Sequence, residues 1–135
     1  MVKEKGLRRT GRRLAGIVGL VLALCAPAAA HHTFTKTYAE GTRVSIEGDV
    51  ESFDYRNPHA FLFVLVPDSN KQMQRWAAEW APAALLRRMQ ILPETLRPGD
   101  HVIVTGFPAR DPEEHRILLR AIERPRDAWS WAFEK

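Results

Sequence analysis

Short apolar segments separated by turn residues run along most of this chain and restrict it to a small, mainly β fold. Residues 43–51 alternate apolar and polar side chains, the pattern of a half-buried strand. Residues 60–66 form a continuous apolar run, as expected for a central strand covered on both faces. Residues 101–107 and 116–123 alternate again, each after a turn sequence, with Ile117, Leu119 and Ala121 sharing one face.

The first of these strands is predicted to be long and bent. Phe53 falls in the alternate set of positions that polar residues fill up to Glu51, so we expect a bulge near Ser52. Gly48 stands at an inward position, where the missing side chain lets a strand coil.

Residues 73–80 fit two structures. Trp76 and Trp80 are four apart, which suits a helix, whereas the tight turn before Lys71 suits a hairpin that returns as a strand. We predict the strand.

A short helix is predicted next. Pro82 can open it, and Leu85, Leu86 and Met89 would form its apolar stripe before Pro93 ends it. The element order is then strand, strand, strand, helix, strand, strand. This order predicts a small five-stranded oligonucleotide/oligosaccharide-binding (OB)-like β-barrel with one helix between the third and fourth strands.

The first thirty residues have the pattern of a cleavable export signal. Basic residues end at Arg13, an apolar run follows, and Ala28-Ala29-Ala30 supplies the small residues of a cleavage site. We expect a periplasmic protein cleaved after Ala30, with no stable membrane insertion afterwards. The expected organisation is a signal peptide at 1–30, an OB-like domain at 31–124 and a C-terminal tail at 125–135.

Removal of that segment changes the charge and the chemistry of the chain. The whole sequence carries +4, but residues 31–135 hold 14 basic and 15 acidic residues and no cysteine. Such a domain lacks the electrostatic footprint of a nucleic-acid binder. It also lacks the nucleophile elbow, phosphate-binding loop and His-Glu-x-x-His motifs of common enzymes. We therefore expect a non-enzymatic protein that binds no nucleic acid.

Histidines provide the sharpest chemical hypothesis. Cleavage after Ala30 would give His31 a free amine beside its imidazole, and nitrogen donors so grouped suit Cu(II). His32 or His59 could complete this set, or the amine could act with the amide and ring of His32. The alternatives are a solvated terminus and, for His59, a turn histidine bonded to backbone.

Tryptophans are the second group of candidates. Trp76 and Trp80 would pack the barrel or line a ligand groove, and Trp129 and Trp131 would close one end of the barrel or contact a partner. Glu79 is interpreted as an edge carboxylate paired with an arginine.

Several motifs occur here in one order: His31-His32-Thr33-Phe34, Asn57-Pro58-His59-Ala60, Trp76 with Glu79, Leu85-Leu86-Arg87-Arg88, and Pro98-Gly99-Asp100 with Gly106. Residues 31–123 thereby resemble small exported bacterial proteins known only as domain of unknown function 6152. Members of that family begin with His-His after the signal and carry the Asn-Pro-His motif. The resemblance implies an exported location and an OB-like fold, and it implies no activity.

The sequence thus favours a periplasmic OB-like binding module whose most concrete ligand is copper, held by His31, His32 and His59. The alternative is a metal-free module that binds an envelope protein or a saccharide through the barrel face and the tryptophans.

Overall fold

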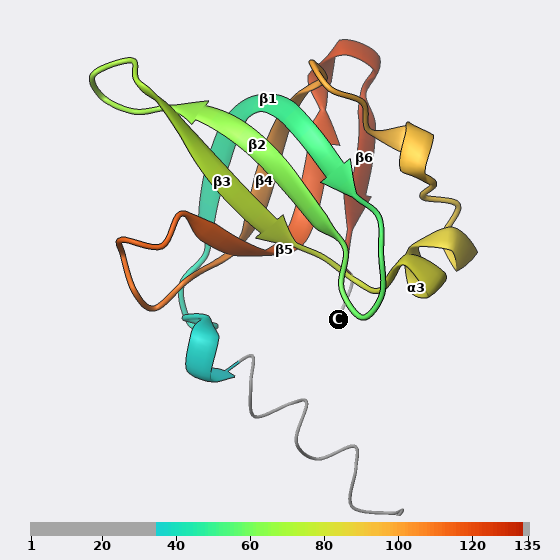
Figure 1. Cartoon of the computed structure of the whole chain (residues 1–135), viewed down its shortest axis with the longest axis horizontal. Helices are drawn as coiled ribbons and strands as arrows, with labels where there is room; N and C mark the ends of the chain where they lie inside the picture. The colour runs from blue at the N-terminus through green and yellow to red at the C-terminus, as the bar shows by residue number, and fades with distance from the viewer. Residues whose placement is uncertain (1–34, 134–135) are drawn as a thin grey trace, which may run out of the picture. The chain divides into compact units, whose positions relative to one another are not determined.

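The computed structural model describes residues 35–133, and six strands are its main regular structure (Figure 1). The strands are β1 (Val44–Asp54), β2 (Phe61–Pro67), β3 (Met73–Glu79), β4 (His101–Pro108), β5 (Arg116–Arg124) and β6 (Trp129–Ala132). The helices are short: α3 (Ala83–Arg88), η1 (Pro93–Thr95) and η2 (Pro125–Asp127). None of the helices described is long and apolar enough to cross a membrane.

The first five strands close into a barrel. Antiparallel pairs join β3 to β2, β2 to β1, β1 to β4 and β4 to β5, and a parallel pairing of β3 with β5 completes the ring. This confirms the mainly β fold, the OB-like barrel and the helix between the third and fourth strands. Residues 129–132, which the sequence placed in a tail, form β6 and pair with β5.

The predicted bend in β1 is confirmed. The register with β2 shifts between Val50 and Ser52, so one residue of β1 has no opposite partner. Gly48 is the second feature that lets β1 bend, because an added Cβ there would lie 2.1 Å from the carbonyl oxygen of Leu65. Only glycine permits this close crossing of β1 over β2, and the close crossing lets one strand take part in both sides of the barrel.

A second register shift corrects the prediction for β5. The pairing of β4 with β5 slips between Thr105 and Gly106, so Arg120 is an extra residue. Ile117 and Leu119 are buried as expected, but after the slip Ile122 is buried and Ala121 is only half-buried. The inward parity changes within the strand, which simple alternation does not predict.

Helix α3 also differs from its predicted stripe. Leu86 is fully buried, whereas Leu85 is 43% exposed and Met89 is 36% exposed. A helix of six residues makes fewer than two turns, so it presents one large side chain to the core and leaves its neighbours outside.

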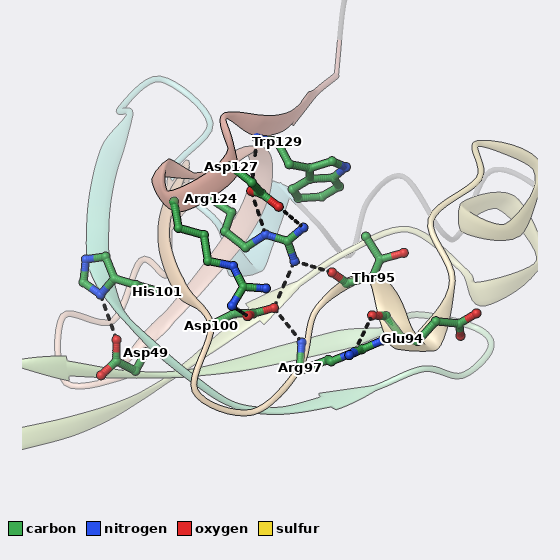
Figure 2. A network of polar contacts seen from close by, with 10 residues as sticks. Asp49, Glu94, Thr95, Arg97, Asp100, His101, Arg124, Asp127 and Trp129 are labelled. Carbon is green, nitrogen blue, oxygen red and sulfur yellow. Dashed lines mark hydrogen bonds and ion pairs between the residues drawn. The ribbon is translucent and has the colours of Figure 1, made fainter.

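A buried carboxylate fastens the C-terminal segment to the barrel (Figure 2). Asp100 follows Gly99, whose φ of 86° favours glycine. One oxygen of Asp100 accepts hydrogen bonds from the backbone N–H of Arg97 at 2.9 Å and the guanidinium of Arg124 at 3.0 Å. The other oxygen lies 2.9 Å from the guanidinium of Arg126. The Pro-Gly-Asp turn therefore holds the end of β5 and the start of η2 in place.

We predict that Asp100→Asn lowers the free energy of unfolding by about 2 to 4 kcal/mol at neutral pH, because it leaves the largely buried Arg124 without a full counter-charge. Urea unfolding followed by circular dichroism measures this change. Asp127→Asn is the matched control, since Asp127 contacts the same arginine from an exposed position. Its expected cost is below about 1 kcal/mol. Equal losses in the two variants would contradict this assignment.

The same contact should depend on pH. Burial alone would raise the pKa of Asp100, but the Arg97 N–H and the charges of Arg124 and Arg126 outweigh it and hold that pKa below its ordinary value of 3.8. The stabilisation is therefore present above that ordinary value and is lost as pH falls through the folded pKa. The stability difference between wild type and Asp100→Asn should shrink in acid.

Candidate functional site

The outer face of β2 and β3 carries two stacked aromatic rings. Phe61 and Phe63 point outward from β2, their centroids are 6.2 Å apart, and both are half-buried. Leu62 and Val64, between and after them, are fully buried in the barrel. The apolar run at 60–66 was predicted to be covered on both faces, and this is wrong, because the described chain places no second layer of strands or helices over these rings.

Arginine side chains partly cover these rings instead. The guanidinium carbon of Arg75 lies 3.7 Å from the centroid of Phe63. Those of Arg56 and Arg116 lie 5.6 Å and 5.5 Å from the centroid of Phe61. Flat apolar rings edged by guanidinium groups can stack against a ring-shaped ligand while donating hydrogen bonds to its oxygens. We call these five residues the aromatic-arginine face.

A cluster of polar side chains lies at the end of this face, where β3 pairs with β5. Glu79 is only 4% exposed and has three partners. The Tyr38 hydroxyl donates a hydrogen bond to Oε2, the Arg116 guanidinium lies 2.5 Å from that same oxygen, and Nδ1 of His59 lies 2.8 Å from Oε1. The carboxylate therefore joins three separate segments of the chain.

Tyr38 reaches this cluster because its backbone is held at the edge of β4. It forms a bridge with Ala109, and the N–H of Ala39 donates to the carbonyl of Pro108 at 2.9 Å. Its burial, followed by the hydrogen bond and charge of Glu79, raises the pKa of the Tyr38 hydroxyl far above its ordinary value. The Tyr38 hydroxyl therefore stays protonated at physiological pH and donates a hydrogen bond to Glu79.

Arg116 stays charged in the same cluster. Burial tends to lower the pKa of its guanidinium, but the hydrogen bond and charge of Glu79 and the proximity of Tyr38 raise the pKa above its ordinary value. Glu79 was interpreted from the sequence as a carboxylate paired with an arginine at a strand edge. The pairing is confirmed, but the carboxylate is buried. No feature of the local sequence indicates the tyrosine, which precedes it by 41 residues.

The predicted histidine site is only partly described. His31 and His32 lie outside the described residues. His59 is in the Glu79 cluster, so its described contact is with a carboxylate side chain. His101 and His115 are exposed, as expected. Within residues 35–133, no three or more His, Cys, Asp or Glu side chains are grouped so as to hold a metal ion.

The four tryptophans all contact the barrel core. Trp80 is buried, and its ring centroid lies 5.0 Å from that of Trp131. Trp76 is half-buried and its ring tilts against His115 at 5.2 Å. Trp129 is half-buried below the guanidinium of Arg124, at 5.4 Å. Trp129 and Trp131 thus pack from β6 against the end of the barrel, while Trp76 and Trp80 belong to β3 and the residue after it.

We predict that Glu79→Gln costs about 2 to 4 kcal/mol of unfolding free energy, because it removes the buried counter-charge of Arg116. Glu51→Gln is the matched control, since Glu51 contacts Arg75 at 2.5 Å near the surface. That control should cost less than about 1 kcal/mol. Chemical denaturation of both variants at neutral pH measures the difference. A Glu79→Gln protein as stable as wild type would show that the cluster is not a structural tie.

Comparison with known proteins places this fold in a family. A family model described as a family of unknown function (DUF6152) matches residues 19–118, which agrees with the resemblance noted in the sequence. No curated protein and no solved structure matches the chain. The match covers most of the barrel, and the chain belongs to the family of unknown function DUF6152.

Proposed function

We propose that this protein is a non-enzymatic binding module of the cell envelope and that it binds a saccharide on the aromatic-arginine face. The observation that carries the proposal is the stacked pair Phe61 and Phe63, which faces outward from the barrel with three arginines around it. The strands of an OB barrel that carry these residues are those that bind oligonucleotides and oligosaccharides in other proteins. The analogy with other OB barrels indicates only where on the barrel a ligand would bind, and the proposal itself rests on the side chains found there.

The side chains favour a saccharide that carries carboxylates. An aromatic ring packs well against the apolar face of a sugar ring, and guanidinium groups pair with carboxylates in a fork geometry. Nucleic acid fits less well, because residues 31–135 carry about one negative charge overall. The basic and apolar pattern of residues 1–30 supports a periplasmic location, where such saccharides occur.

The face should bind soluble peptidoglycan fragments, which carry carboxylates, more tightly than a neutral maltooligosaccharide. Phe63→Ala should weaken binding of the fragments about tenfold or more, because it removes the ring below Arg75. Isothermal titration calorimetry measures both affinities. Phe133→Ala is the matched control, since Phe133 is an exposed phenylalanine on a different part of the chain. Equal binding by wild type and Phe63→Ala would refute the proposed face.

We propose Cu(II) binding at the mature N-terminus as a second candidate function, with His31 supplying amine and imidazole and with His32 and His59 as further ligands. The specific observation is the 2.8 Å contact of His59 Nδ1 with Glu79. A carboxylate that accepts a hydrogen bond from one ring nitrogen orients the ring and increases the basicity of the other nitrogen, as at many metal-binding histidines.

The covalent chain also permits this arrangement. Tyr38 contacts the carboxylate that holds His59, and His31 precedes Tyr38 by seven residues. Seven residues span at most about 25 Å, so the length of the chain does not prevent the amine of His31 from reaching His59.

The mature protein beginning at His31 should bind one Cu(II), and a form with one extra leading residue should bind it at least tenfold more weakly, because the amine is then displaced from the imidazole. His59→Ala should weaken binding only if this ring reaches the ion, and His115→Ala is its control. Calorimetric titration and the electron paramagnetic resonance spectrum measure affinity and nitrogen ligation. Export followed by intact mass determines the true first residue. Equal binding by both forms would exclude the N-terminal site.

A further inference from the structure

A hollow of about 620 Å³ lies between the loop that joins β1 to β2 and helix α3. Figure 1 shows the loop beside the helix, on the side of the barrel where β3 ends. Three arginines line it: Arg56 from the loop, and Arg87 and Arg88 from the helix. Cations from two segments, 31 residues apart in sequence, therefore border one concave surface.

Backbone contacts of the lining residues fix the width of this hollow. The carbonyl of Arg56 accepts a hydrogen bond from the N–H of Ala83 at 3.1 Å, and the Asn57 side chain accepts one from the N–H of Ala84 at 3.2 Å. The Tyr55 hydroxyl lies 2.9 Å from the carbonyl of Ala83. The loop is thus bound to the first turn of α3, so the three arginines project from a preformed base.

The charge of the hollow is largely uncompensated. Arg56 pairs with Asp54 at 3.1 Å, but both side chains are exposed, so this pair is weak and readily exchanged. Within the described residues, neither Arg87 nor Arg88 forms an ion pair with a carboxylate. Three guanidinium groups therefore border the hollow, and within the described residues Asp54 is the one carboxylate paired with any of them. Such a concentration attracts an anion with several acceptor oxygens.

Apolar side chains stand next to these arginines on the same helix. Leu85 and Met89 are exposed, and they lie one turn apart. At about 100° per residue, Leu85 and Met89 lie on the side of the helix next to Arg88 and away from Arg87. Arginine beside exposed leucine and methionine is the pattern of a surface that meets phosphate headgroups with its cations and the acyl boundary with its apolar residues.

We infer that this hollow binds a phosphate group through Arg56, Arg87 and Arg88. The shared chemistry is the phosphate, which either a soluble phosphate ester or a phospholipid headgroup can supply, and Leu85 and Met89 favour the headgroup. Arg87 and Arg88 take part in neither the saccharide nor the copper proposal, so failure of those proposals leaves this one standing, although Arg56 is shared with the aromatic-arginine face.

Two probes separate the sources of phosphate. Glycerol 3-phosphate is titrated against ¹⁵N-labelled protein by NMR, and phosphatidylcholine vesicles with and without phosphatidylglycerol are tested by co-sedimentation. The amides of Asn57 and Ala84 should shift with the soluble ester. Binding to vesicles should require phosphatidylglycerol and should decline as salt is added.

The variant Arg87→Gln with Arg88→Gln should weaken binding of either probe about tenfold or more, since two charge-assisted contacts are lost. The matched control is Arg43→Gln with Arg110→Gln, which removes the same charge from exposed positions elsewhere and should change affinity less than about twofold. Leu85→Ser with Met89→Ser should weaken vesicle binding alone if a headgroup is the source. Both double substitutions in α3 alter exposed side chains, so the barrel should fold unchanged.

Binding of the soluble ester without vesicle binding would support a phosphate site with a soluble ligand. Absence of binding to both probes, or equal losses in the α3 arginine variant and its control, would overturn the inference. Amide shifts centred away from the hollow in the unaltered protein would also overturn it, whatever the variants do.

Discussion

The parallel pairing of β3 with β5 is the contact on which the barrel depends. It joins only residues 77–79 to residues 116–118, whereas longer antiparallel ladders join the other neighbouring strands. Three parallel pairs contribute little by themselves. The ion pair of Glu79 with Arg116 spans this seam, and Tyr38 fastens the preceding segment to the same carboxylate. Closure of the barrel and construction of the candidate site are therefore one event, because each requires β5 to lie beside β3.

Local sequence patterns were sufficient to predict the strands but not to predict the aromatic-arginine face. Alternation and turn residues predicted five barrel strands and the bend near Ser52. Such patterns are informative because successive side chains of a strand point alternately to the core and to water. The run at 60–66 was misjudged because Phe61 and Phe63 are shielded by guanidinium groups rather than by a second layer. Hydrophobicity read along the chain reports that a side chain avoids water, but it does not distinguish a packed layer from the stems of long arginines.

Contacts between residues far apart in the chain could not be predicted from the sequence, for a different reason. Arg56 and Arg87 border one hollow only because the loop after β1 is bound to helix α3. Asn57 accepts a hydrogen bond from the N–H of Ala84, and the Tyr55 hydroxyl contacts the carbonyls of Ala83 and Ile91. The parity change in β5 follows from the slip beside Gly106, where a Cβ would lie 2.0 Å from the carbonyl of Leu118. Such approaches are set by how strands cross, and a single sequence without its pairings does not contain that information.

Arginines of this domain differ in whether a buried carboxylate of the protein neutralises their charge. Arg116 and Arg124 are matched by the buried carboxylates of Glu79 and Asp100 and serve the fold. Arg87 and Arg88 remain uncompensated within the described chain, and Arg56 belongs to two surfaces, since it lies over Phe61 and also lines the hollow. If an anionic ligand occupies each surface, both ligands draw on the charge of Arg56. Each then lowers the affinity of the other by the same factor, because coupling between two binding sites is reciprocal. Shared use of one guanidinium would thus link two otherwise separate sites without any change in the barrel.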